Sequence, residues 1–341
     1  MKRVLIVINS ESGGGAERSM NLLASSLILR GVHVEIVAVN NGEADLFKPS
    51  CPIYLLNREW KGGLFSTISA AIKLRKLVNH VRPNISILNC ELPELLWLGV
   101  RKKEKFIIVE HTTRPWNNRR LLGFIVRSIL NFYAIGWVTV SRNGRIWPLN
   151  RMPIEVIPNP IQLPKSSERD HSNLSTTTPK LVFIGRLNQV KQPDLFLDIC
   201  IATGREGLLI GEGPLRNELE KKIADSKTDI EILGYKSDPW RYVSEEDIVI
   251  ITSKLEGDGM VALEAIKKKT KLLLLDNPDL RRLGLPETNY AKNIQDFKNV
   301  IQGHFDGIKK LDLSEEKSSE LLVPRELEII TDSWLKLLDS V

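Results

Sequence analysis

Cysteine is scarce in this sequence, with only Cys51, Cys90 and Cys200 among 341 residues. The three are odd in number, far apart and in no metal-ligand spacing, so neither a disulfide framework nor a zinc site is indicated. This pattern favours a reducing, cytoplasmic location.

Long apolar runs are scarce too. The first run, in "MKRVLIVINS", is far shorter than a membrane helix or the apolar part of a signal peptide, and it predicts a buried strand. The stretch from Leu121 to Val140 is long enough to span a membrane, but it carries Arg127 and Asn131 and ends in β-branched residues. A helix followed by a strand is the better interpretation.

Several binding signatures are missing. The glycines after the first strand lack the G-x-G-x-x-G spacing of dinucleotide-binding folds, and no G-x-x-x-x-G-K-[ST] joins a strand to a helix. The sequence has no D-x-D that would hold a metal on a diphosphate, so neither a metal nor a cofactor is expected. The basic residues are scattered among apolar segments without a nucleic-acid reader motif, which argues against a nucleic-acid partner.

The charge balance is mildly basic. Lys and Arg number 48 against 42 Asp and Glu, for a formal net charge of +6. Such an excess suggests an anionic partner, and anionic lipid and sugar phosphate fit better than nucleic acid.

What the sequence does contain is a regular alternation of strands and helices. "RVLIVI" precedes the amphipathic "GAERSMNLLASSLILRG", and the same order recurs in both halves, which implies parallel βαβ units. After Asn159 the chain becomes rich in Pro, Ser and Thr, as an exposed linker is. We predict two Rossmann-like, doubly wound parallel-sheet domains that face each other across a cleft, over 1–160 and 179–324, with a linker over 161–178. A terminal helix over 325–341 either crosses back to the first domain or packs locally.

Open sheets of this kind bind ligands at the carboxyl ends of their strands. In the first half, Gly13, Gly14 and Gly15 follow the first strand and open a helix, where bare N–H groups suit a phosphate or a sugar. A merely flexible turn is the alternative. His111 follows the strand "KFIIVE" and is either a structural histidine or a ligand of the site.

The second half places cations after its first strand. Arg186 and Lys191 follow Gly185, and they could converge on one anion, although a solvated loop is the alternative. Glycines also end the neighbouring strands, in "LIGEGP" and "ILGY", and we interpret them as clearing space for a ligand.

The most informative stretch is "SKLEGDGMVALEAIKKK", from Ser253 to Lys269. It predicts a loop after a strand and then a helix whose first N–H groups, near Gly259, Met260 and Val261, would cap a diphosphate.

Two acids flank this turn, eight residues apart. Glu256 and Glu264 could each accept hydrogen bonds from a pair of sugar hydroxyls. The alternative for Glu264 is an exposed helix residue that pairs with Lys268.

Together, several pieces resemble the GT-B glycosyltransferases of family 4, which are retaining and use nucleotide sugars. The match runs from Val4 to about Leu275, and its most specific parts are the E-x7-E element and the upstream Arg and Lys. The pieces are "SGGGAE", "VEH", "IPNPI", "FIGRLNQVKQPD", "IGEGPLRNELE", "ILGY" and "EGDGMVALEAI".

The resemblance implies roles for these residues. Glu256 would contact the donor sugar, Glu264 the ribose, and Arg186 and Lys191 the diphosphate, with no metal. His111 and the turn at Gly14 and Gly15 would lie beside the transferred sugar, and the base would lie near Leu233. Where the family often has an aromatic residue and a proline, this chain departs from the pattern with Asp258 and Gly259, at a position that bears on the donor and on the phosphate turn.

The sequence says less about the acceptor than about the donor. The stretch from Arg114 to 137 combines Trp116, Arg119, Arg120 and Arg127 with an apolar stripe, so it is either core or a helix that lies on an anionic membrane. We predict transfer of a sugar from a nucleoside-diphosphate donor to a saccharide or lipid-linked acceptor, in bacterial surface polysaccharide biosynthesis. A non-catalytic sugar-nucleotide-binding protein and a sugar-nucleotide epimerase are the alternatives. A two-carboxylate glycosidase is disfavoured, because each acid has its own sugar to hold.

Overall fold

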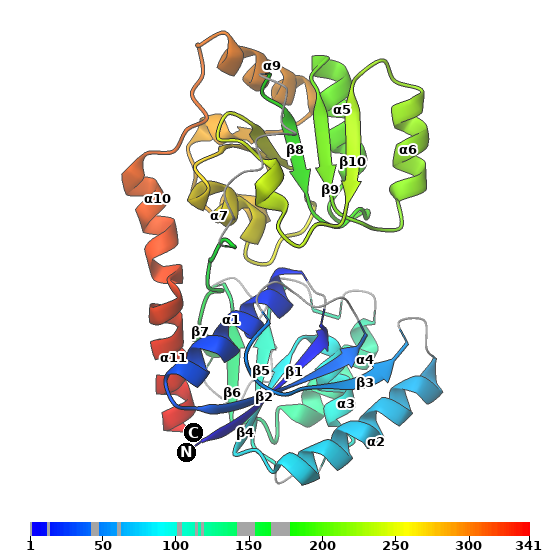
Figure 1. Cartoon of the computed structure of the whole chain (residues 1–341), viewed down its shortest axis with the longest axis vertical. Coiled ribbons are helices and arrows are strands. Elements are labelled where there is room, and N and C mark those ends of the chain that lie inside the picture. Colours follow the sequence, from blue (N-terminus) through cyan, green and yellow to red (C-terminus); the bar gives the residue numbers. More distant parts are fainter. Residues whose placement is uncertain are drawn as a thin grey trace. The chain divides into compact units, whose positions relative to one another are not determined.

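The computed structural model describes residues 2–11, 14–41, 48–59, 63–100, 104–112, 115–116, 119–141, 154–164 and 178–341. The chain forms two compact units (Figure 1). The first combines Met1–Pro160 with Pro324–Val341, and the second is Ile161–Val323.

The first unit is a parallel sheet in the strand order β3-β2-β1-β4-β5-β6-β7. Strands β1, β2, β4, β5 and β6 are buried on both faces, and β1, β2 and β5 are accordingly rich in Val, Ile and Leu. The described elements are β1 (Arg3–Ser10), α1 (Gly15–Leu29), β2 (His33–Asn40), β3 (Ile53–Arg58), α2 (Leu64–Val81), β4 (Ile85–Asn89), α3 (Glu91–Trp97), β5 (Phe106–Glu110), α4 (Arg120–Leu130), β6 (Gly136–Thr139), β7 (Ile154–Val156) and α11 (Leu327–Ser340).

Two apolar cores lie on the two faces of this sheet. Helices α1 and α11 cover one face, and α2, α3 and α4 cover the other (Figure 1). The terminal helix packs its stripe of Ile330, Trp334 and Leu338 against α1, and the Thr331 hydroxyl donates to the Ser26 hydroxyl at 2.8 Å. The end of the chain therefore belongs to the first unit.

The second unit repeats the architecture, with the strand order β10-β9-β8-β11-β12-β13 and parallel pairing. Its elements are β8 (Leu181–Ile184), α5 (Pro193–Thr203), β9 (Gly207–Ile210), α6 (Arg216–Ala224), β10 (Ile230–Gly234), the 3-10 turn η2 (Pro239–Tyr242), β11 (Ile248–Ile251), α7 (Met260–Lys267), β12 (Lys271–Leu275), α8 (Pro278–Arg281), the 3-10 turn η3 (Glu287–Asn289), β13 (Tyr290–Ala291), α9 (Ile294–Phe305) and α10 (Glu315–Leu322), and the 3-10 turn η4 (Val323–Arg325) follows.

Both sheets are parallel and carry helices on their faces, so the predicted fold class is confirmed. The stretch from Leu121 to Val140 forms α4 and then β6, as predicted. Among the residues with described structure, no helix is both long enough and apolar enough to cross a bilayer. The predicted linker falls largely on 165–177, outside the described residues.

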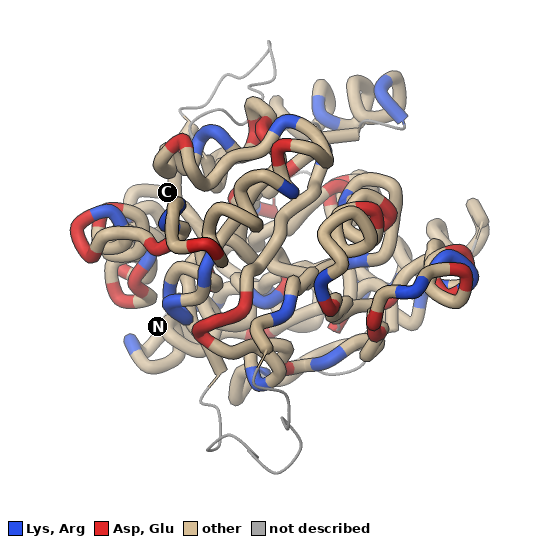
Figure 2. Tube along the Cα trace, turned by 90° about the horizontal axis from the view of Figure 1, so that it is seen from above, with Lys and Arg blue, Asp and Glu red and all other residues tan. Residues whose placement is uncertain are grey.

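Charged residues of both signs are mixed along the chain. Figure 2 shows Lys and Arg interspersed with Asp and Glu over the described trace, rather than gathered into one long basic run. The expectation of no nucleic-acid partner depends on this distribution and stays a prediction.

Candidate functional site

Lys191 and Glu256 meet at the carboxyl edge of the second sheet. Lys191 lies in the loop after β8, and Glu256 lies in the loop after β11, the strand next to β8. The Lys191 ammonium donates to Glu256 Oε1, and the Ser253 hydroxyl donates to the same oxygen at 2.9 Å. Both side chains are mostly buried, at 27% and 12% exposure. Two residues that are 65 positions apart thus form one charged pair.

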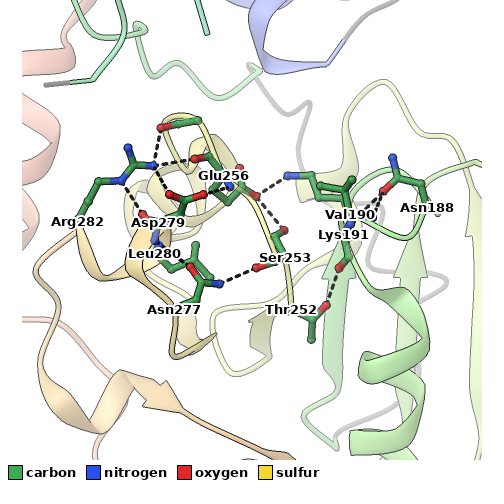
Figure 3. Close-up of polar contacts among 11 residues, drawn as sticks. Asn188, Val190, Lys191, Thr252, Ser253, Glu256, Asn277, Asp279, Leu280 and Arg282 are labelled. Atoms are coloured by element: carbon green, nitrogen blue, oxygen red, sulfur yellow. Dashed lines mark hydrogen bonds and ion pairs between the residues drawn. The ribbon is translucent and has the colours of Figure 1, made fainter. Parts of the chain in front are cut away.

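The loop that carries Lys191 is held by hydrogen bonds to its backbone. Asn188 Oδ1 accepts from the backbone N–H groups of Val190, at 3.1 Å, and Lys191, at 2.9 Å. The Thr252 hydroxyl, from the end of β11, is within hydrogen-bond distance of the carbonyls of Lys191 and Gln192. The position of the Lys191 backbone is therefore tied to the strand that leads to Glu256 (Figure 3).

The loop that carries Glu256 is tied to the segment after β12. Asp279 Oδ2 accepts from the Glu256 backbone N–H at 3.1 Å, and Arg282 donates to the carbonyls of Glu256, at 2.7 Å, and Gly257, at 3.1 Å. Asn277 caps the start of α8 and donates to the Ser253 carbonyl at 2.7 Å. Figure 3 shows Asn277, Asp279 and Arg282 on one side of the loop, where their hydrogen bonds hold its backbone.

Helix α7 begins directly after this loop. Its N-cap, Gly259, has φ 71° and ψ 37°, a left-handed conformation that glycine adopts without strain, and no side chain caps the helix. The first N–H groups of a helix, here those of Met260 and Val261, have no acceptor within the helix and lie at its positive end. This end therefore offers donors suited to an anion.

Glu264 is buried in α7, and Trp240 Nε1 donates to its Oε2 at 2.9 Å. The alternative of an exposed residue paired with Lys268 is therefore wrong. Trp240 lies in η2, which follows β10, the strand that contains Leu233. Leu233 is half-buried against the apolar core on the α7 side of the sheet.

Two of the glycines that follow strands, Gly211 and Gly213, pack against backbone atoms. A Cβ at Gly211 would lie 1.9 Å from the Gly185 carbonyl oxygen, and one at Gly213 would lie 2.3 Å from the Leu187 carbonyl oxygen. The interpretation that these glycines clear space for a ligand is wrong for Gly211 and Gly213. At Gly185 a Cβ would reach only ordinary contacts, among them Lys191 Cγ at 3.9 Å.

Arg186 follows Gly185 and is exposed, and no ion pair joins it to a described residue. The structure thus brings Lys191, but not Arg186, onto Glu256. Whether Arg186 reaches the same anion stays a prediction.

The predicted residues of the first unit lie at the carboxyl edge of its own sheet. Gly14 is the N-cap of α1 and Gly15 its first residue, and a Cβ at Gly14 would meet nothing within 4 Å. Gly13 lies outside the described residues. His111 follows β5 with both ring nitrogens buried. Burial lowers the pKa of His111 to about 4, against the opposing effect of the Asn159 side chain, so the ring is neutral near pH 7.

Glu110, the residue before His111, belongs to a buried ionic cluster with Glu94 and Arg127. Arg127 of α4 donates from Nε to Glu94 Oε2 at 2.9 Å, from Nη2 to Glu94 Oε1 at 2.7 Å, and also to Glu110. The three side chains are almost fully buried. Of the two alternatives for this stretch, the membrane-facing one is therefore wrong for Arg127, because its guanidinium neutralises two core carboxylates.

Glu110 should make the stability of the first unit depend on pH. Burial raises the pKa of Glu110 to about 7, although Arg127 opposes the shift. At pH values between the usual pKa of a glutamate and 7, the carboxyl binds more protons in the folded protein than in the unfolded one. Its contribution to stability is therefore lost as pH rises through this window. The lowered pKa of His111 makes stability rise with pH in an overlapping window, so the test compares two proteins that both contain His111. The melting temperature of the wild type should fall relative to that of Glu110→Gln between about pH 4.5 and 7. Parallel profiles would contradict this expectation.

Sequence reasoning missed the residues that hold the two loops, namely Asn188, Thr252, Ser253, Asn277, Asp279 and Arg282. The "DNPD" after β12 does carry a local signal, because Asn before Pro marks an N-cap and a first helical residue. It predicts α8 but not the tertiary contact of α8 with the Glu256 loop.

Comparison with known proteins gives one family match and several whole-chain similarities. Residues 164–282, which include Lys191 and Glu256, match the family model "Glycosyl transferases group 1". One curated relative, from Campylobacter jejuni, is 22% identical over 100% of this chain and 99% of its own. It is named GalNAc-alpha-(1->4)-GalNAc-alpha-(1->3)-diNAcBac-PP-undecaprenol alpha-1,4-N-acetyl-D-galactosaminyltransferase.

Solved structures share the whole architecture. Anabaena HepE, in complex with UDP and glucose, superposes with a TM-score of 0.81 at 16% identity, covering 100% of both chains. A sucrose-phosphate synthase from Thermosynechococcus elongatus superposes with a TM-score of 0.80 at 14% identity, covering 100% of this chain and 99% of its own. At these identities the similarity is one of fold, which is the two-domain GT-B fold.

Proposed function

We propose that this chain, a glycosyltransferase with the GT-B fold, moves a sugar from a nucleoside-diphosphate donor to a saccharide or lipid-linked acceptor, with retention at the anomeric carbon. The setting that fits best is bacterial surface polysaccharide biosynthesis, such as lipopolysaccharide, O antigen or capsule. The second unit would bind the donor and the first unit the acceptor.

The observation that carries this proposal is the Lys191–Glu256 pair just before the open start of α7. Leaving-group departure puts negative charge on the diphosphate while the sugar gains positive character. A fixed ammonium and helix N–H groups aimed at that diphosphate stabilise the transition state more than the ground state. The Glu256 carboxylate would accept hydrogen bonds from hydroxyls of the donor sugar, and Glu264, already fixed by Trp240, would accept from the ribose.

Side-chain cations would neutralise the diphosphate here in place of a metal. Arg186 would join Lys191 for this purpose, because its exposed guanidinium is five residues away in the same loop. His111, neutral near pH 7, would exchange hydrogen bonds with the transferred sugar rather than act as a cation. Transfer should therefore persist when divalent metals are chelated, and a transfer assay with and without EDTA checks this.

The acceptor class follows from the relatives. Two curated Campylobacter jejuni relatives, 22% and 21% identical, are named as transferases whose substrates carry a diphospho-undecaprenol. A lipid-linked acceptor of that type resides in a membrane, so part of our proposal is peripheral contact of this protein with the inner face of the cytoplasmic membrane.

A donor screen tests the proposal. The full-length protein is melted with a panel of nucleoside-diphosphate sugars, and a true donor at about a hundred times its Kd should stabilise it by about 2.7 kcal/mol. The donor identified in this way is then supplied with lipid-linked oligosaccharide acceptors. A panel in which no nucleotide sugar raises the melting temperature would contradict the proposal.

Arg282 should matter for activity without contacting the donor. Removing its side chain in Arg282→Ala frees the carbonyls of Glu256 and Gly257, so we expect a loss of about tenfold in kcat/KM, from kcat more than from KM. Arg282→Lys should recover little, because one ammonium cannot reproduce the guanidinium contacts. Arg281→Ala is the matched control: its neighbouring guanidinium pairs with Asp276 and Glu287 but not with the loop. Equal losses in Arg282→Ala and Arg281→Ala would rule out the positioning role.

A further inference from the structure

Helices α2 and α4 of the first unit each expose an apolar stripe opposite the face that packs on the sheet. In α2, Ala70, Leu74 and Val78 are buried, and the opposite side exposes Leu64, Phe65, Ile68 and Ile72. In α4, Val126, Arg127 and Leu130 are buried, and the opposite side exposes Leu121, Phe124, Ile125 and Ile129. A surface helix normally carries polar residues on its outer side.

These two stripes point away from the same face of the sheet. The buried sides of α2 and α4 share one core, and α3 packs against both helices between them (Figure 1). We call the exposed apolar residues of the two helices, with Phe132 and Tyr133 after α4, the α2–α4 face. Clusters of exposed apolar side chains, unlike single ones, mark interaction sites.

The exposure is greatest where each helix begins. Phe65 is 89% exposed, Leu64 72% and Leu121 75%, and all three lie in a first turn. Helices that follow parallel strands start at the carboxyl edge of the sheet, so these side chains lie at the edge where His111 and the start of α1 are found. A partner on this face would therefore adjoin the edge to which the first unit's site residues belong.

The charges of the α2–α4 face select an anionic partner. Neither helix contains Asp or Glu, whereas Lys73, Arg75 and Lys76 lie in α2 and Arg119 and Arg120 lie at the start of α4. Arg58, at the end of β3, donates to Thr67 of α2 at 3.2 Å, and its pKa is lowered by burial and by the nearby Arg119 guanidinium. These cations give the face a positive charge that an anionic partner would complement.

We propose that the α2–α4 face docks on an anionic lipid bilayer. Leu, Ile and Phe side chains would enter the boundary between headgroups and acyl chains while the Lys and Arg residues meet anionic headgroups. The proposal rests on the proposed function in one respect, since a lipid-linked acceptor would lie in that bilayer. It adds α2, which is separate from the stretch 114–137 in sequence.

Vesicle binding by the full-length protein tests this surface. Co-sedimentation is measured with vesicles of phosphatidylglycerol and phosphatidylcholine and with phosphatidylcholine alone, at low and high salt. We expect binding to the anionic vesicles that weakens in high salt, and at least about a tenfold loss of partition in the double variant Leu64→Ser, Phe65→Ser. Leu29→Ser is the matched control, because Leu29 is 86% exposed at the end of α1, on the opposite face of the same sheet.

The outcomes are distinct from those of the donor screen. Donor-induced stabilisation should be the same in wild type and the double variant, so a failed donor screen with intact vesicle binding would refute the proposed function alone. Equal partition of wild type and the double variant would refute the membrane face. So would light scattering that shows a stable dimer without lipid which the double variant abolishes, because the face would then be covered by a second copy.

Discussion

Lys191→Ala should reduce kcat/KM by about a hundredfold, which corresponds to roughly 3 kcal/mol of lost transition-state stabilisation. The Lys191 ammonium is held at the carboxyl edge of the second sheet by Glu256, and its loop is fixed by Asn188 and Thr252. Because Asn188 and Thr252 fix the backbone that carries Lys191, this loop has little freedom to lose when a diphosphate takes the place of Glu256. A steady-state transfer assay with the donor found in the screen measures the effect.

Lys254→Ala is the control for this variant. Lys254 is exposed and lies two residues before Glu256, and the structure ties it to the other loop through its backbone N–H, which donates to the Val190 carbonyl at 2.8 Å. Alanine keeps that bond, so activity should stay near that of the wild type. Because Lys191→Ala removes one partner of a mostly buried pair, the melting temperatures of both variants are measured beside their activities, so that a loss of folding is told apart from a loss of catalysis. A Lys191→Ala enzyme within threefold of wild type would contradict the assigned role.

Arg127→Met should destabilise the first unit by about 3–5 kcal/mol. The variant removes the only positive partner that the structure describes for two almost fully buried carboxylates, Glu94 and Glu110, and leaves both without a counter-ion. The melting temperature and the free energy of unfolding in denaturant measure the loss. Arg127 lowers the pKa of Glu110, so without it the carboxyl keeps its proton to a higher pH than in the wild type, and the loss should grow as pH rises above about 7.

Two further variants separate charge from packing. Arg120→Met lies on the same helix at an exposed position and should change stability by less than about 0.5 kcal/mol. The triple variant Arg127→Met, Glu94→Leu, Glu110→Leu replaces the whole cluster by apolar side chains and should recover much of the loss, because no buried charge is then uncompensated. A stable Arg127→Met protein would mean that the carboxylates are neutralised in some other way.

The fold could be predicted from the sequence because both sheets are built from long, fully buried runs. Strands such as β1 and β12 are continuous apolar segments bounded by turn residues. The prediction missed β3, an edge strand with alternating exposure, and β7 and β13, which span three and two residues. It also missed α9, although Asn293 caps that helix by accepting from the Asp296 N–H, a signal present in the sequence.

The candidate site was predictable only in part. Positions that follow strands are local information, so Lys191, Glu256 and Gly259 could be singled out from order and spacing. Their contacts depend on tertiary packing: Arg282 and Asp279 reach the Glu256 loop from a separate segment, and Trp240 reaches Glu264 from another. For Arg127 the sequence left core and membrane-facing positions open, because helical spacing shows that a helix has two faces but not which one packs on the sheet.

The structure of the protein with a bound nucleoside diphosphate tests the central claim most directly. We predict that a diphosphate oxygen lies within hydrogen-bond distance of Lys191 Nζ and of a backbone N–H at Met260 or Val261, with Glu256 released from Lys191. A diphosphate bound away from Lys191 and from the start of α7 would contradict the account.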